Sequence, residues 1–116
     1  MKNSILGLGS DLHFFLCQKP VNMNLGIEGL RGLIINQLGK DPQDGSVYIF
    51  LSRNRKIVKL LHFHDDIYTM YTRKIYRGSF IYPTINQETD TYEMDWVRLR
   101  RLVTQHSVSQ SQKTQI

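Results

Sequence analysis

The chain has 116 residues, a length that suits one domain with a single modest core. Hydrophobic residues make up 41% of it and charged residues 22%, as in ordinary globular proteins, which excludes an intrinsically disordered chain. The apolar runs are too short to span a bilayer, and the first ten residues lack the pattern of a signal peptide. We therefore expect a cytoplasmic protein without membrane contact.

The net charge of +5 is concentrated in one stretch of the chain. Residues 53–77 hold seven basic residues against two acidic ones, while the rest of the chain is neutral. A localised excess of positive charge indicates an anionic partner better than a spread excess does.

The first part of the chain is expected to contain a lead-in, a strand and a helix. Residues 1–11 are rich in Gly, Ser and Asn, which predicts a flexible lead-in, and residues 13–17 read as a short strand. Apolar residues then recur at helical spacing, which predicts a helix over about residues 25–38. Asn22 or Asn24 can cap its start. Three glycines spaced three apart suggest a helix face that packs directly on a sheet: Gly26, Gly29 and Gly32.

Four β-rich runs follow the helix and are joined by short polar turns. The expected strands cover residues 47–51, 56–64, 67–75 and 79–82, and the first is apolar throughout, as in a central strand. Consecutive strands with such short links form an antiparallel meander. The sequence thus predicts an α+β fold in which an antiparallel sheet of four to five strands packs on one main helix.

The single domain is expected to cover residues 12–106. Asp95 can cap a C-terminal helix with Trp96 and Leu99 in its apolar stripe, and the polar residues 107–116 are expected to be a disordered tail. The residues expected in the core are Ile27, Leu30, Ile34, Val47, Ile49, Leu60 and Phe80.

The run His62-Phe63-His64-Asp65-Asp66 is the sharpest candidate for a metal site. Alternate residues of a strand face the same side, so both imidazoles can meet one cation. Zinc sites usually bring further Cys or His ligands, however, and the remaining histidines are distant in sequence. A solvent-side histidine pair before an Asp-Asp turn is the favoured interpretation, so we assign no metal and no other cofactor.

Catalytic signatures are missing from the sequence. The acidic residues occupy turns, helix starts and a polar linker, whereas two-metal cleavage of DNA needs carboxylates that converge. There is no Gly-rich phosphate loop and no nucleophile elbow, and Cys17 lies in an apolar run rather than a basic setting. We assign no catalytic residue and expect a protein that is not an enzyme.

A basic hairpin tip is expected at residues 52–56, between two strands. Such a ribbon can bind phosphates or enter a major groove, and tyrosines near the basic residues can stack on unpaired bases. The alternative is a solvated tip beside ordinary strand tyrosines. The candidate nucleic-acid-binding residues are Arg53, Asn54, Arg55, Lys56, Lys59, Arg73, Lys74 and Arg77.

Three stretches occur in an order and spacing that resemble a known family. They run from Pro20 to Leu30 (with Gly-Ile-Glu-Gly-Leu), from Leu38 to Leu61 (with Tyr-Ile-Phe and Arg-Asn-Arg), and from Tyr71 to Pro83 (with Arg-Lys-Ile and Gly-Ser-Phe). Together they resemble TnpB, the family of transposition accessory proteins encoded by the second open reading frame of insertion sequence 66 elements. Asn22 and Asn24 depart from the Asp and Arg that the family often has there.

The resemblance implies a bacterial accessory protein that acts in transposition beside a separate, larger transposase. The leading hypothesis is non-catalytic binding of DNA, either at the element ends or without sequence preference. The second is a protein-interaction module that binds the transposase with little DNA contact, and the third is a metal-dependent nuclease. A salt titration of DNA binding separates the first two, because each neutralised phosphate adds to the salt dependence.

Overall fold

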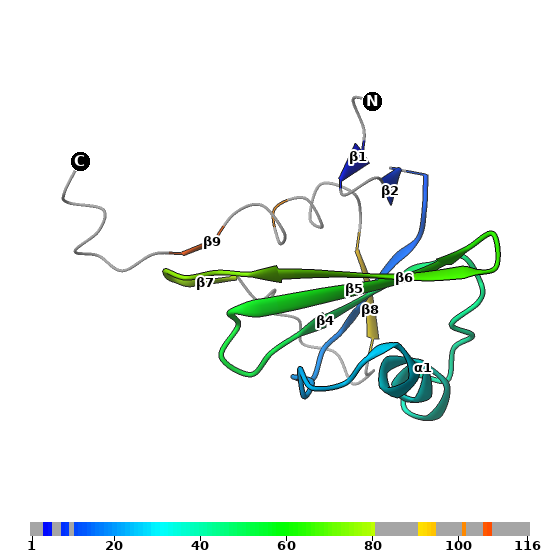
Figure 1. Ribbon diagram of the computed structural model, residues 1–116, viewed down its shortest axis with the longest axis horizontal. Helices are drawn as coiled ribbons and strands as arrows, with labels where there is room; N and C mark the ends of the chain where they lie inside the picture. Colours follow the sequence, from blue (N-terminus) through cyan, green and yellow to red (C-terminus); the bar gives the residue numbers. More distant parts are fainter. Residues whose placement is uncertain are drawn as a thin grey trace.

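The structure, a computed structural model, describes residues 4–5, 8–9, 11–80, 91–94, 101 and 106–107. Its main elements, in chain order, are β3 (Phe14–Cys17), α1 (Ile27–Asn36), β4 (Val47–Leu51), β5 (Ile57–His64), β6 (Ile67–Lys74) and β8 (Thr91–Met94). The strands form one five-stranded sheet in the order β6-β5-β4-β3-β8, and α1 lies against one of its faces (Figure 1). The predicted α+β class, with one main helix on a sheet, is confirmed.

The neighbours β3 and β4 run parallel, whereas the other described pairs of this sheet are antiparallel. The chain passes through α1 between them, and such a crossover brings the second strand back in the direction of the first. The sequence predicts a strand and a helix at these positions but not the parallel pairing. The expected antiparallel sheet is therefore corrected to a mixed one.

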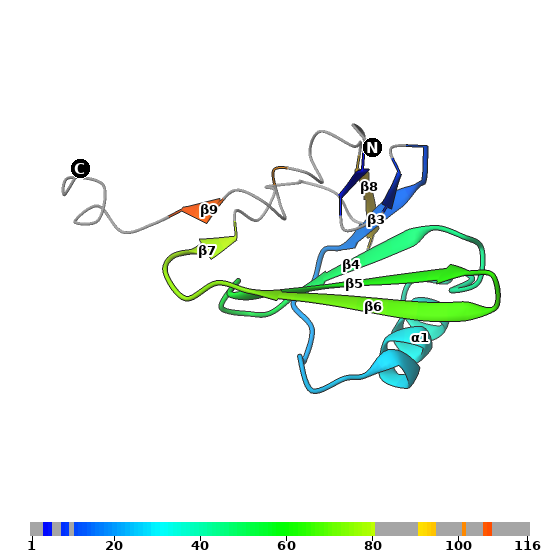
Figure 2. The ribbon, with the colours of Figure 1, turned by 45° about the horizontal axis from the view of Figure 1, so that its top comes forward.

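The meander is formed by β4, β5 and β6, which lie side by side (Figure 2). All five residues of β4 are buried, as expected of a central strand whose two faces are both covered. The turn between β5 and β6 consists of Asp65 and Asp66, both of which have positive φ angles, 53° and 62°. That conformation is typical of the tightest hairpin turns.

The fourth expected strand leaves the meander. β7 (Ser79–Phe80) pairs with β9 (His106–Ser107) in a separate two-stranded sheet, so the meander ends with β6. Gly78 has a φ of 77°, which redirects the chain, and the Phe80 amide then donates to the Arg55 carbonyl, 2.7 Å away. The chain is thus drawn over the β4–β5 turn instead of extending the edge of β6.

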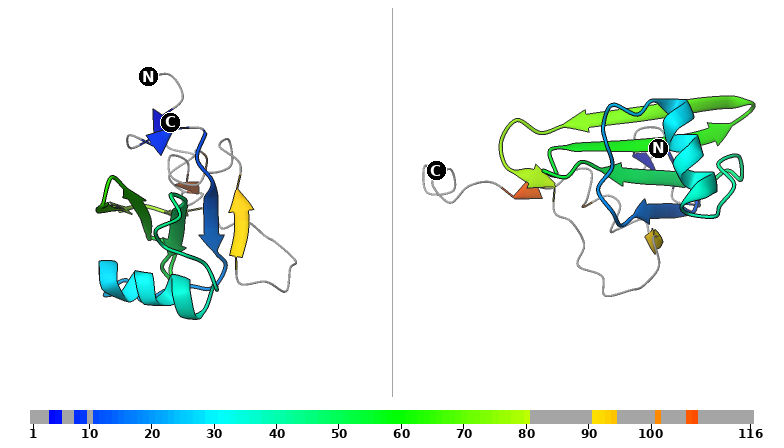
Figure 3. Two further views of the ribbon diagram at one scale, coloured as in Figure 1. Left: turned by 90° about the vertical axis from the view of Figure 1, so that its right-hand side faces the viewer. Right: turned by 90° about the horizontal axis from the view of Figure 1, so that it is seen from below.

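Each face of the sheet buries its own apolar cluster. α1 covers one face of the sheet (Figure 3). On this helix face, Leu30 and Ile34 of α1 pack with Tyr48, Phe50 and Leu61 of the sheet. On the far face, the cluster combines residues of β3, β4 and β5 with Leu8 and Phe80 from outside the main sheet. Its members are Leu8, Phe14, Leu16, Val47, Ile49, Leu51, Val58, Leu60 and Phe80. Six of the seven residues expected in the core are buried, and Ile27 is half-buried.

The helix begins and packs differently from expectation. Gly26 occupies the N-cap, and the Asn22 side chain instead accepts a hydrogen bond from the Asn24 amide, 2.9 Å away. The glycines do not meet the sheet: Gly26 faces open space, and a Cβ at Gly29 would meet Leu25 at 2.7 Å. The sheet contact is made by the large residues Leu30 and Ile34, so the expectation of a glycine face on the sheet is wrong.

Short strands also occur within the segment expected to be a flexible lead-in. β1 (Ser4–Ile5) pairs with β2 (Leu8–Gly9), and Leu8 is only 1% exposed within the far-face cluster. The expected C-terminal helix at residues 95–103 and the expected tail at residues 107–116 lie almost wholly outside the described residues. Within the described part of the chain, no helix has the length and apolarity needed to cross a membrane.

Candidate nucleic-acid interface

The turn between β4 and β5 is organised by one buried serine. The Ser52 hydroxyl accepts hydrogen bonds from the Lys56 and Ile57 amides at 3.1 and 3.0 Å and donates one to the Asn54 side chain at 2.8 Å. The same Asn54 oxygen accepts from the Lys56 amide at 3.1 Å. Ser52 and Asn54 therefore shape the turn, and the exposed Arg53 and Arg55 side chains extend from it.

Arg55 adopts a left-handed backbone conformation with a φ of 59°. Glycine is the residue that adopts it without a steric penalty, and an L residue with a Cβ atom pays roughly 1 kcal/mol or more there. The turn thus keeps an arginine at a position where backbone geometry favours glycine. The Arg55 backbone also holds the turn together, because its amide donates to the Ser52 carbonyl at 3.0 Å and its carbonyl accepts from the Phe80 amide at 2.7 Å.

A second turn, residues 75–78, is fastened to the first one. The Ile75 amide donates to the Lys56 carbonyl at 2.8 Å, and the Lys56 ammonium donates to the Gly78 carbonyl, also at 2.8 Å. Together with the bond from the Phe80 amide to the Arg55 carbonyl, these contacts hold both sides of the second turn. Tyr76, with 92% of its surface exposed, and Arg77 are therefore presented beside the basic hairpin tip.

Six basic residues of the predicted site meet at this end of the sheet, which we call the cationic end: Arg53, Arg55, Lys56, Arg73, Lys74 and Arg77. In the β5–β6 register, Val58 pairs with Arg73 and Ile57 with Lys74. Successive residues of a strand point to opposite faces, so Arg73 and Lys74 extend to different sides. The cations surround the end of the sheet rather than covering one flat face. All six are exposed except Lys56, which is half-buried.

Lys59 does not belong to this surface. It is only 8% exposed, and its ammonium group donates to the Met23 and Leu25 carbonyls at 2.8 and 2.9 Å. A buried cation needs such oxygens to replace the water that it loses. Lys59 therefore ties the segment that leads into α1 to the sheet, a structural task that its place in the basic stretch does not reveal.

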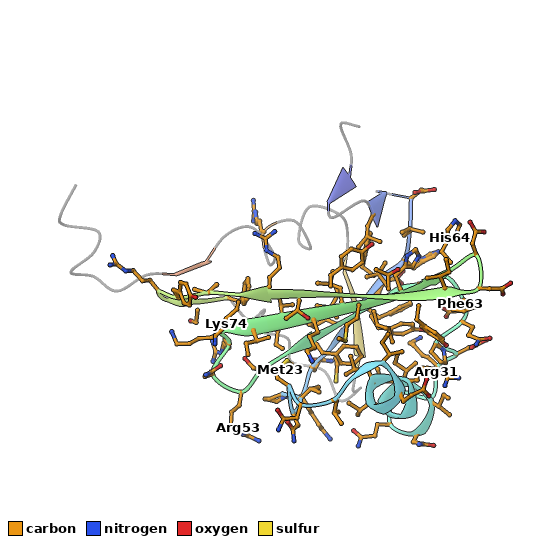
Figure 4. All side chains as sticks on the ribbon, viewed as in Figure 1. Met23, Arg31, Arg53, Phe63, His64 and Lys74 are labelled. Atoms are coloured by element: carbon orange, nitrogen blue, oxygen red, sulfur yellow. The ribbon has the colours of Figure 1, made fainter. Side chains whose placement is uncertain are left out.

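An open depression of about 400 Å³ lies beside the hairpin tip. Met23 and Arg53, two of the residues that line it, lie on the same side of the sheet in Figure 4. Val21, Met23 and Ile57 give it an apolar floor, and Ser52, Arg53 and Asn54 form its polar edge. No sequence signal predicts this depression, because Val21 and Met23 precede the helix and lie outside any periodic pattern. The depression can accept an apolar group that carries negative charge nearby.

The opposite end of the sheet is acidic. We call Asp41, Asp44, Asp65 and Asp66 the acidic end; two lie in the turn before β4 and two in the β5–β6 turn. Asp41 and Asp44 accept hydrogen bonds from the Gln43 and Ser46 amides at 2.9 and 2.8 Å. The buried Tyr48 hydroxyl donates to Asp44 at 2.9 Å. Burial and, to a lesser extent, this hydrogen bond raise the pKa of Tyr48 above its usual range. These two carboxylates are used to build the turn.

The histidine pair lies at the acidic end, with Phe63 and His64 at the opposite side of Figure 4 from Arg53 and Lys74. The His62 and His64 rings stack with centroids 6.0 Å apart, so the expected common orientation is confirmed. His64 also lies 3.3 Å from the Asp65 carboxylate. Across the described residues, no three His, Cys, Asp or Glu side chains form a group that could hold a metal ion.

The tyrosines expected near the basic residues have different environments. Tyr68 packs against Phe63, with ring centroids 4.7 Å apart, and its hydroxyl accepts a hydrogen bond from Arg31 at 2.9 Å. That bond and, to a lesser extent, the hydrogen bond from Arg31 to Glu28 at 2.7 Å raise the pKa of Arg31. Tyr71 packs against the far-face cluster. Tyr76 is the tyrosine that the structure leaves exposed at the cationic end, and Tyr82 lies outside the described residues.

Comparison with known proteins gives one family and one relative. Residues 12–113 match the family described as IS66 Orf2 like protein. The chain is 21% identical over 107 residues to a Sinorhizobium fredii (strain NBRC 101917 / NGR234) protein named "Uncharacterized protein y4jC", covering 84% of this chain and 92% of that protein. No solved structure matches the chain.

Proposed function

Because the chain belongs to the IS66 Orf2-like family and is thus an accessory protein of an insertion element, we propose that it binds DNA without cutting it, beside a separate transposase. The cationic end is the contact surface. The transposase and the DNA of the element, at its ends or elsewhere, are the partners of this proposal.

One observation carries the proposal: the fold gathers basic residues from three parts of the chain at one end of the sheet. The β4–β5 turn supplies Arg53 and Arg55, β6 supplies Arg73 and Lys74, and the following turn supplies Arg77. The phosphate backbone is the part of DNA that such a surface binds, and it contributes affinity without sequence preference.

The test is a DNA titration across salt concentrations with a variant that keeps the net charge of the protein. Arg53→Gln with Arg55→Gln removes two positive charges from the cationic end. Asp65→Asn with Asp66→Asn removes two negative charges from the acidic end and restores the net charge. We expect the fourfold variant to bind as weakly as the double arginine variant, with a salt slope reduced by about 1.8, since each phosphate contact contributes about 0.9.

Full recovery of affinity in the fourfold variant would contradict the proposal, because net charge rather than local contact would then govern binding. The Asp65→Asn and Asp66→Asn variant alone is the matched control. It should bind DNA at least as well as the unchanged protein, since it only removes repulsion of phosphates.

The depression beside Arg53 favours a second candidate function, binding of the transposase. Its apolar floor and cationic edge suit a protein segment with an apolar side chain next to an acidic one. Met23→Gln changes the floor without changing charge. If this function is correct, the unchanged protein co-purifies with the transposase in high salt and the variant does not, while DNA affinity is the same for both. Equal co-purification of both proteins would remove this candidate.

A further inference from the structure

We infer that the cationic end takes an unpaired DNA strand, with the Tyr76 ring stacked on one of its bases. The inference rests on the proposed function and deepens it, because it specifies the form of DNA that the surface prefers. It is carried by the exposure of Tyr76, the fixed position of its turn and the cations around it.

The exposure of Tyr76 sets it apart from the other described tyrosines of the basic stretch. Its surface is 92% exposed, whereas Tyr68 packs on Phe63 and Tyr71 on the far-face cluster. The fold therefore uses the other two rings for packing and leaves the Tyr76 ring accessible. Both faces of an aromatic ring are suited to stacking on a base of any identity.

The turn that carries Tyr76 is held on both sides. Hydrogen bonds of 2.7 to 2.8 Å link the Ile75 amide to Lys56, the Lys56 ammonium to Gly78 and the Phe80 amide to Arg55. A residue presented from a fixed turn loses less conformational freedom on binding than one on an unattached loop. The backbone that carries Tyr76 is thus held beside the hairpin tip that carries Arg53 and Arg55.

The surrounding charges match the backbone of a single strand. Arg77 follows Tyr76 directly, Lys74 precedes it by two residues, and the hairpin tip with Arg53 is bonded to the same turn. Aromatic rings combined with a basic surface are how proteins bind single strands without sequence readout. In a duplex the bases are already paired and stacked, so the ring could reach one only after that base is unpaired and unstacked, which costs free energy.

The experiment compares a short mixed-sequence strand with the same strand annealed to its complement, each titrated with the unchanged protein, Tyr76→Ala and Tyr76→Phe. We expect the unchanged protein to prefer the single strand. Tyr76→Ala should weaken single-strand binding by about 5- to 150-fold, the usual effect of losing one stacked base, and leave duplex binding within about twofold. The salt slope should not change, because no charge is removed.

Tyr76→Phe is the matched control and should bind the single strand like the unchanged protein, because it keeps the ring. A strand that carries 2-aminopurine gives a direct readout: its fluorescence should be quenched by the unchanged protein and by Tyr76→Phe but not by Tyr76→Ala. Tyr76 is exposed, so melting curves of the three proteins should coincide.

Equal affinity of the unchanged protein for both DNA forms, with no effect of Tyr76→Ala, would overturn the inference while the proposed DNA binding stands. If the unchanged protein binds neither DNA form at low salt, the proposed function itself fails. If Tyr76→Ala keeps DNA binding but loses the transposase, the ring belongs to a protein interface and the inference is likewise overturned.

Discussion

The two ends of the sheet carry opposite charges, and different kinds of residue shape the turns there. At the acidic end, Asp41 and Asp44 bind the backbone amides of their own turn, so the fold itself accounts for these acids. At the cationic end, Ser52 and Asn54 make the bonds that shape the hairpin tip, and the arginines extend outward. A charged residue that the fold does not need for its turn is the better candidate for a task outside the fold.

The separation of charge also orients the molecule. Four aspartates lie at one end of β5 and six basic residues at the other. A protein with such an arrangement approaches a polyanion with its positive end first, and the acidic end is kept away from the phosphates. Orientation of this kind would leave the acidic end for other contacts.

The largest effect on stability is expected at Lys59, which the sequence assigns to the cationic stretch and the structure to the interior. Lys59→Met should lower the free energy of unfolding by about 3 kcal/mol, because the Met23 and Leu25 carbonyls lose their donor. Urea unfolding measures the loss. The matched control Lys74→Met, on the same strand pair but exposed, should stay within about 0.5 kcal/mol and weaken DNA binding instead.

If Lys59→Met left stability unchanged and reduced DNA affinity as Lys74→Met does, the distinction between an interior lysine and a surface lysine would be wrong. Affinity must be measured well below the melting temperature of the variant, so that loss of folded protein is not read as loss of binding.

A smaller and opposite effect is expected at Arg55. Arg55→Gly should raise the free energy of unfolding by about 1 kcal/mol, because glycine adopts the left-handed conformation without the penalty of a Cβ atom. The same variant should bind DNA more weakly, since it loses a cation. Arg55→Ala separates the two effects: it should lose the same affinity without the gain in stability. A loss of stability in Arg55→Gly would show that the arginine side chain serves the fold.

The acidic turn provides the counterpart at the other end. Asp65→Asn with Asp66→Gly places the preferred pair for a two-residue hairpin at φ angles of 53° and 62°. Thermal unfolding should show a gain of up to about 1 kcal/mol, with DNA affinity equal to or slightly above that of the unchanged protein. A marked loss of DNA affinity would place the acidic end, too, in the interface.

Local patterns in the sequence predict β3, α1 and the strands β4 to β7. They predict neither the short strands β1, β2, β8 and β9 nor two of the strand pairings. The apolar run of β4 and the turns on either side of β5 predict the meander, because those signals lie within a few residues of each other. The parallel pairing of β3 with β4 and the pairing of β7 with β9 join residues far apart in the chain. No periodicity in the sequence encodes such long-range choices.

The candidate site divides in the same way. The basic composition of residues 53–77 predicts the cationic end, because a charge in a turn is usually exposed. The exception is Lys59, which lies among apolar residues of β5 and points to the helix side of the sheet. There its ammonium group donates to the Met23 and Leu25 carbonyls. The composition includes the charge of Lys59, but its buried position depends on the strand register and on the path of residues 23–25. The exposure of Tyr76 depends equally on how the second turn is tied to the first.

The smallest effect concerns pH at the acidic end, where His62 is half-buried. Burial and, to a lesser extent, the neighbouring His64 lower the pKa of His62, while a backbone hydrogen bond with Gly45 acts in the opposite direction. The unfolded chain therefore binds a proton more readily than the folded one. Stability should be constant above about pH 7.5 and fall as the pH decreases through the ordinary value of about 6.5 towards pH 5.

The measurement is the midpoint of thermal unfolding across that range, for the unchanged protein, His62→Gln and His64→Gln. His62→Gln removes the titrating group and should flatten the profile. His64→Gln removes the neighbouring group that lowers the pKa of His62, so His62 should titrate closer to its ordinary pKa and the decline should become shallower without disappearing. DNA binding at the cationic end should follow none of these changes, because that surface is built of arginine and lysine, residue types whose ordinary pKa values lie far above this range. If His62→Gln lowered the affinity for DNA at constant salt, the acidic end would also belong to the DNA interface, and the separation of the two ends would be wrong.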